Sequence, residues 1–145
     1  MYNILVAVAD YPDINGKTSM MYVHMRNMYY IQNGIDVTVL NFATKQNYII
    51  DKIRVISLNS YKKQISHYDA LIIHASNIRN HYLFLIRYGK KFSKLIFFYH
   101  GHEVLAVNKV YPKPYPYIRY SIIKNFCKIV MTLSNYVCGD IIFLK

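Results

Sequence analysis

Two histidines and a carboxylate cluster directly after an apolar run in the second half of the chain. The segment His100-Gly101-His102-Glu103 follows residues 95–99, LIFFY. Imidazoles exchange protons near neutral pH, and a neighbouring carboxylate adds a strong hydrogen-bond acceptor. Polar residues at this density at the end of a strand usually face a ligand or solvent, so we expect the segment to line a site.

These histidines are also potential metal ligands. His100 and His102 stand two residues apart and could converge with His74, but the chain has no HExxH-type spacing. The two cysteines, Cys127 and Cys138, stand alone rather than in a CxxC pair, which argues against zinc. We therefore expect neither a metal site nor a bound cofactor.

A second polar segment closes another apolar run. His74 lies near the end of residues 68–75, YDALIIHA, and Ser76 and Asn77 follow it. Either Ser76 or Asn77 can cap a following helix, and for Asn77 capping is the simpler interpretation. This segment also lies where a predicted strand ends.

Gly16, Lys17 and Thr18 lie between a predicted strand and a predicted helix, and they match the end of a phosphate-binding Walker A loop. That loop requires glycine at the position of Tyr11, and Pro12 removes a backbone amide that it would use. The dinucleotide fingerprint GxGxxG is absent as well. A P-loop and an NAD site are therefore disfavoured.

What remains is a loop with one glycine that leads into a helix N-terminus. The free amides and the dipole of such a terminus suit an anionic or polyhydroxylated ligand. An ordinary turn between strand and helix explains this segment equally well. We take Gly16 and Lys17 as candidate ligand-binding residues.

The remaining histidines, His24, His67 and His81, fall on predicted helical or loop surfaces, and we interpret them as ordinary polar residues. No GxSxG elbow is present, and no cysteine stands beside a histidine in the sequence. Hydrolysis by a Ser-His-Asp type of triad is therefore not expected.

Apolar runs predict six strands, of which the first is buried on both faces and the second has one wetter face. The strands are expected at residues 4–9, 35–42, 53–58, 68–75, 95–100 and 128–134. Helical stretches are expected between the first and second strands, near Asn77, and from about Pro116. This alternation predicts a doubly wound parallel α/β sheet.

The first helix has clear start and stop signals. Thr18 or Ser19 can cap it, Met21 and Met25 begin its helical spacing, and Asn33-Gly34 ends it. In a sheet of order 3-2-1-4-5-6, ligands bind beyond the carboxyl ends of strands one and four. Three segments would meet there: residues 10–18, 74–77 and 100–103.

Length and composition predict one folded domain over residues 1–145, with 54% hydrophobic residues. The net charge is +11, and residues 79–128 hold ten Lys or Arg against the single acid Glu103. Such an excess indicates an anionic partner, which could be nucleic acid, lipid headgroups or a phosphorylated substrate. No run is long enough to span a membrane and no signal peptide is evident, so we expect a cytoplasmic protein.

Together these segments resemble the N-terminal, Rossmann-like domains of retaining GT-B glycosyltransferases, the family 4-like or group 1 enzymes. The likeness is carried by ILVAVADYPDINGKTSMMYVHMRNMYYIQNGIDVTVL, YDALIIHAS, FFYHGHEVL and KIVMTLSNYV, in this order along the chain. The most specific part is the glycine loop, followed by a helix that ends in Asn-Gly before a VTVL strand.

The resemblance implies roles for the candidate residues. Gly16 would approach the donor diphosphate and the acceptor, and His100 would hydrogen-bond the transferred sugar. The acceptor side of the cleft would be lined by the remaining candidates, which are Lys17, His74, Ser76, Asn77, Gly101, His102 and Glu103. Lys17 stands where many relatives carry a second glycine, which leaves the path of the loop open.

The resemblance also implies metal-independent sugar transfer from a nucleotide sugar to a glycan or lipid-linked acceptor, as in bacterial surface polysaccharide synthesis. The donor would bind mainly to a C-terminal domain that residues 1–145 do not contain. We expect peripheral contact with the anionic inner face of the cell membrane and no nucleic acid. The alternatives are a non-catalytic subunit of a split glycosyltransferase and a basic nucleic-acid-binding α/β domain.

Overall fold

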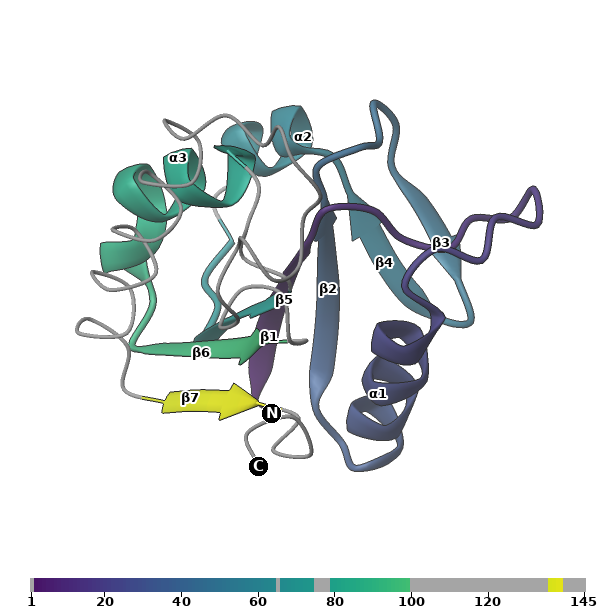
Figure 1. Ribbon diagram of the computed structural model, residues 1–145, viewed down its shortest axis with the longest axis horizontal. Helices are drawn as coiled ribbons and strands as arrows, with labels where there is room; N and C mark the ends of the chain where they lie inside the picture. Colours follow the sequence, from purple (N-terminus) through teal and green to yellow (C-terminus); the bar gives the residue numbers. More distant parts are fainter. Residues whose placement is uncertain (1, 65, 75–78, 100–135, 140–145) are drawn as a thin grey trace, which may run out of the picture.

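The computed structural model describes residues 2–64, 66–74, 79–99 and 136–139. Their strands form one seven-stranded sheet in the order β3-β4-β2-β1-β5-β6-β7 (Figure 1). The strands are β1 (Asn3–Val8), β2 (Asp36–Asn41), β3 (Tyr48–Ile50), β4 (Ile53–Ile56), β5 (Ala70–His74), β6 (Lys94–Tyr99) and β7 (Tyr136–Gly139). The helices are α1 (Met21–Gln32), α2 (Leu58–Lys63) and α3 (Arg79–Tyr88), with a 3-10 turn, η1 (Gly89–Lys91), after α3.

The sheet is parallel except at one edge. Strands β4, β2, β1, β5, β6 and β7 run parallel, and β3 pairs antiparallel with β4. The predicted α/β class and the predicted order of the first five strands are confirmed. The predicted strand at 128–134 lies outside the described residues, and β7 takes the sixth parallel position.

Helices cover both faces of the sheet, with α2 and α3 on one side and α1 on the other (Figure 1). The alternation of side chains along β1 explains this arrangement. Leu5 and Ala7 belong to the core under α2 and α3, whereas Ile4, Val6 and Val8 belong to the core under α1. The prediction that the first strand is buried on both faces is therefore confirmed.

The wetter face predicted for the second strand is found at Asp36, which is exposed, but not at Thr38. Thr38 of β2 is buried, and Nη2 of Arg54 on the neighbouring β4 donates a hydrogen bond to its hydroxyl at 3.0 Å. A buried polar side chain needs a hydrogen-bond partner, and the exposed Arg54 supplies one to Thr38.

The end of the third predicted strand also differs from the structure. β4 stops at Ile56, and Ser57 caps α2 by accepting a hydrogen bond from the backbone amide of Ser60 at 3.2 Å. Leu58 is therefore helical. The short strand β3 was not predicted; it forms a hairpin with β4 through Asp51 and Lys52, which both have positive φ.

Helix α1 ends as predicted but begins differently. Gly34 has a φ of +77° after the C-cap Asn33. The N-cap is Met20, in a left-handed conformation and without a side-chain cap, so the predicted capping by Thr18 or Ser19 is wrong. The Met21 and Met25 stripe faces solvent, and the buried face carries Val23, His24 and Asn27 instead.

Candidate functional site

A polar pocket lies beyond the carboxyl ends of β1 and β2. It is formed by the loop from β1 to α1 and the loop from β2 to β3, which meet at one edge of the sheet (Figure 1). Its volume is about 320 Å³, at the small end of the range of about 300–1,000 Å³ for ligand sites. The lining residues are Asp10, Tyr11, Asp13, Lys17, Asn41, Ala43, Thr44, Lys45, Gln46 and Tyr48.

The loop from β1 to α1 is shaped by Asp13. Its carboxylate accepts hydrogen bonds from the backbone amides of Asn15 at 2.9 Å and Lys17 at 3.1 Å. Gly16 sits inside this turn with a φ of +90°, a conformation that other residues rarely adopt. The predicted glycine is thus required by the path of the loop, and Lys17 is held at the pocket.

An ion pair joins the two ends of this loop. Nζ of Lys17 lies 2.5 Å from Oδ2 of Asp10. Burial alone would raise the pKa of Asp10. The hydrogen bonds that its carboxylate accepts from Lys17 and from the backbone amide of Tyr11 outweigh this effect, so the pKa of Asp10 lies below its ordinary value. The hydrogen bond to Asp10 raises the pKa of Lys17. Both groups are therefore charged near neutral pH.

Tyr48 forms the wall of the pocket on the β3 side. Its hydroxyl donates to the backbone carbonyl of Pro12 at 2.9 Å and accepts from Nδ2 of Asn41 at 3.4 Å. Burial raises the pKa of this hydroxyl. These bonds join the loops after β1 and β2, so the pocket is formed before any ligand arrives.

The lining of the pocket carries balanced charge. Asp10 and Asp13 offset Lys17 and Lys45, and the other polar groups are amides and hydroxyls. Several neutral donors and acceptors around one hollow suit a ligand that offers many hydroxyls. The basic excess of the chain as a whole does not gather here.

Beneath the pocket, a buried hydrogen-bonded chain connects Tyr11 to α1. The Tyr11 hydroxyl lies 3.0 Å from Nδ1 of His24 and accepts from Nδ2 of Asn27 at 3.0 Å. Nε2 of His24 lies 2.9 Å from Oδ2 of Asp51. Burial raises the pKa of Tyr11 far above its ordinary value, so its hydroxyl stays protonated.

Two histidines that we interpreted as surface residues are buried. His24 belongs to the chain just described, and His81 on α3 is fully buried with its ring edge-on to Phe42, at 4.9 Å between centroids. Tertiary packing, which helical spacing alone does not reveal, places both on inward faces. His67 is exposed, as predicted.

His74 lies at the carboxyl end of β5, as predicted, but not in the lining of this pocket. It is fully buried and stacks on Phe98 of β6, with 4.8 Å between ring centroids and an interplanar angle of 5°. The Arg26 guanidinium lies 4.3 Å from the centroid of the same Phe98 ring. Ser76, Asn77, His100, Gly101, His102 and Glu103 lie outside the described residues.

The half of the pocket that follows β2 was missed in the sequence. Asn41 is a polar residue at the end of an apolar strand, as His74 is, and this position is the sequence signal that could have identified Asn41 as a site residue. Thr44, Lys45 and Gln46 follow it in a loop that has no motif of its own, and Tyr48 is the first residue of β3.

Within the part of the chain that the structure describes, no three His, Cys, Asp or Glu side chains gather as a metal-binding group. None of the helices described there has the length and apolar character needed to cross a bilayer. No protein-family model matches the chain, and no curated protein shows significant sequence similarity to it. The resemblance to glycosyltransferases therefore stays a prediction.

Proposed function

We propose that this chain is the acceptor-side domain of a GT-B glycosyltransferase and that the pocket after β1 and β2 holds a sugar ring of the acceptor. The observation that carries the proposal is the charge-balanced, hydroxyl- and amide-lined hollow at the carboxyl edge of a parallel sheet. Doubly wound sheets bind ligands beyond the carboxyl ends of their strands. This pocket lies at those ends, beside β1 and β2 and not at the predicted crevice between β1 and β5. Nucleic acid would favour a cationic groove, and this pocket is not one.

In the proposed reaction an acceptor hydroxyl bonds to the anomeric carbon of the donor sugar, and the bond from that carbon to the nucleoside diphosphate breaks. The hydroxyl proton passes to the departing diphosphate. This domain contributes orientation, because the Asp10 carboxylate and the Lys17 ammonium can hydrogen-bond neighbouring hydroxyls of one ring. By resemblance, His100 would contact the transferred sugar and a second domain would hold the nucleotide.

The pocket can be tested by titrating the ¹⁵N-labelled chain with a panel of neutral mono- and disaccharides. We expect amide shifts to concentrate at Lys17, Ala43 and Thr44, which line the pocket. Loss of one hydrogen bond is worth about 1 kcal/mol, so Asp10→Asn should weaken binding roughly fivefold. Lys52→Gln, outside the pocket, is the control and should bind as the wild type does. Shifts caused only by nucleotides or oligonucleotides would refute the proposal.

A further inference from the structure

Helix α3 exposes two aliphatic side chains. Leu83 is 52% exposed and Ile86 is 79% exposed, while Phe84 between them packs into the core. Residues three apart on a helix are neighbours on its surface, so Leu83 and Ile86 form one apolar strip. The strip borders a groove of about 450 Å³ between α2 and α3. The groove is lined by Leu58, Lys62, Asn80, Leu83, Phe84, Ile86, Arg87 and Tyr88.

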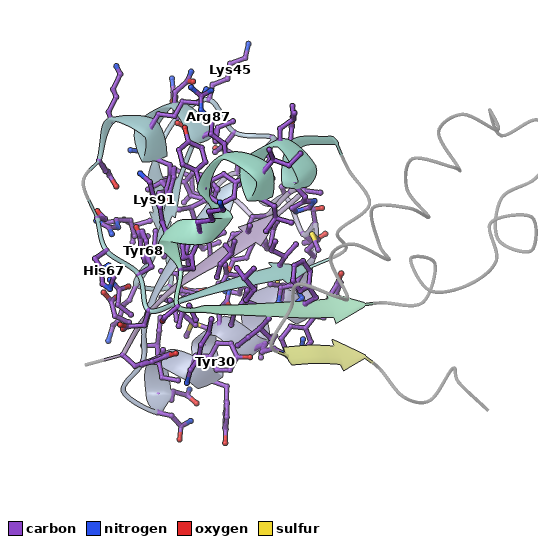
Figure 2. All side chains as sticks on the ribbon, turned by 90° about the vertical axis from the view of Figure 1, so that its left-hand side faces the viewer. Tyr30, Lys45, His67, Tyr68, Arg87 and Lys91 are labelled. Atoms are coloured by element: carbon purple, nitrogen blue, oxygen red, sulfur yellow. The ribbon has the colours of Figure 1, made fainter. Side chains whose placement is uncertain are left out.

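The segments that form this groove also carry several cations. The described side chains of α2, α3 and η1 include five exposed ones that carry positive charge, and the three segments contain no Asp or Glu. These five are Lys62, Lys63, Arg87, Lys90 and Lys91. Arg87 and Lys91 lie 5.9 Å and 5.4 Å from the ring centroid of the half-buried Tyr88. Figure 2 shows both residues on the α3 side of the sheet.

We infer that this basic and apolar face, formed by α2, α3 and η1, docks on an anionic membrane leaflet. Branched aliphatic side chains enter the acyl boundary, cations attract anionic headgroups, and a tyrosine suits the interface between them. Single-stranded nucleic acid is bound instead by exposed aromatic rings that stack on bases. Among the side chains of this face that the structure describes, the exposed apolar ones, Leu83 and Ile86, are aliphatic.

The inference deepens the proposed function and rests on it for one point only: a lipid-linked acceptor would be presented at this leaflet. Lys45 lines the sugar pocket and lies on the same side of the sheet as Arg87 (Figure 2). In a chain docked through α3, the part of the pocket lining that contains Lys45 would therefore face the membrane.

The test is sedimentation of the chain with phosphatidylcholine vesicles, with and without phosphatidylglycerol. We expect retention on the anionic vesicles at low salt and much less on the neutral ones. The triple variant Ile86→Ser, Arg87→Gln, Lys91→Gln should bind the anionic vesicles about tenfold less well. The control is Ile49→Ser, Lys52→Gln, Lys94→Gln, which removes one exposed aliphatic and two cations elsewhere and should bind like the wild type.

The outcomes separate this inference from the proposed function. The first variant should keep the far-ultraviolet circular dichroism spectrum and the melting temperature of the wild type, which shows that it is folded. Equal retention on neutral and anionic vesicles, or equal losses in the two triple variants, would overturn membrane docking. So would self-association in solution that the Ile86 variant abolishes, since the face would then bind a second copy. None of these results depends on whether the pocket takes a sugar.

Discussion

Nε2 of His24, on α1, lies 2.9 Å from Oδ2 of Asp51, in the turn between β3 and β4. Through its other nitrogen the same ring meets the Tyr11 hydroxyl, in the loop that follows β1. One side chain thus ties α1 to the loop after β1, which forms one wall of the pocket, and to the turn between β3 and β4, which lies outside the pocket lining. The sugar-binding geometry we propose depends on this buried connection as well as on the residues that touch the ligand.

Replacing Tyr11 with phenylalanine should destabilise the fold by about 1–3 kcal/mol, because His24 Nδ1 and the Asn27 amide lose their shared partner in a buried place. Urea denaturation followed by circular dichroism measures the change. Tyr61→Phe is the control, since Tyr61 is also buried but its hydroxyl makes no hydrogen bond found among the described residues. Equal losses in the two variants would show that the Tyr11 hydroxyl contributes nothing specific.

Lys52→Gly should stabilise the chain by roughly 0.5–1 kcal/mol. Asp51 and Lys52 form a two-residue hairpin turn, with φ values of 47° and 66° respectively. Glycine is favoured at the second position of such turns, which Lys52 occupies. Thermal unfolding provides the measurement. Gly34→Ala makes the opposite change at a φ of +77° and should lower the melting temperature. A less stable Lys52→Gly variant would contradict the turn geometry.

His81 should make the fold sensitive to acid. Burial lowers its pKa to about 3, and the Ala7 backbone opposes this only weakly, since neither ring nitrogen forms a hydrogen bond of normal geometry. In the unfolded chain His81 binds a proton near pH 6.5, whereas in the folded chain it binds one only near pH 3. The stabilising contribution is therefore complete above pH 6.5 and is lost as the pH falls toward 3, by about 2 kcal/mol at pH 5.

His81→Phe tests this assignment because phenylalanine keeps a ring against Phe42 but does not titrate. The free energy of unfolding, measured by urea titration between pH 5 and pH 7, should fall less steeply in the variant than in the wild type. Identical slopes would mean that His81 binds protons to the same extent in the folded and the unfolded chain over this range, which would contradict its burial in a neutral form.

Saccharide affinity should be nearly constant between pH 5 and pH 8. The pKa of Asp10 lies below its ordinary value and that of Lys17 above it, so the pair stays charged throughout this interval. Because the carboxyl pKa is lowered, the contribution of the pair is present above about pH 4 and is lost as the pH falls through the folded value. Titration calorimetry at four pH values checks this. A tenfold loss between pH 7 and pH 5 would implicate another titrating group.

Much of the sheet could be predicted because long apolar runs report burial directly. β2, β4 and β5 lie within the predicted runs, and β1 and β6 each begin one residue before theirs. The confirmed order follows from the alternation of these strands with helices. β3 and α2 were missed because three and six residues are too few for a periodic signal. The buried face of α1 was missed because His24 and Asn27 are polar, and their burial depends on tertiary hydrogen bonds to Tyr11 and Asp51.

The candidate site was predictable only in part. Gly16 and Lys17 could be identified because a glycine between a strand and a helix marks a special backbone path. The contributions of Asn41 and Tyr48 arise from pairing between β2, β4 and β3, which no local pattern encodes. The sequence therefore predicted one loop of the pocket, and the fold supplied the other.

The most direct test of the central claim is a sugar-transfer assay with the protein encoded by the native gene. It would be incubated with radiolabelled uridine and guanosine diphosphate sugars and with membrane lipid or glycan acceptors. We predict that label moves to the acceptor without added metal, and that Asp10→Asn reduces the rate roughly fivefold or more while Lys52→Gln does not. Transfer at the wild-type rate by the Asp10 variant, or no transfer from any donor by a protein that binds oligonucleotides tightly, would contradict the account.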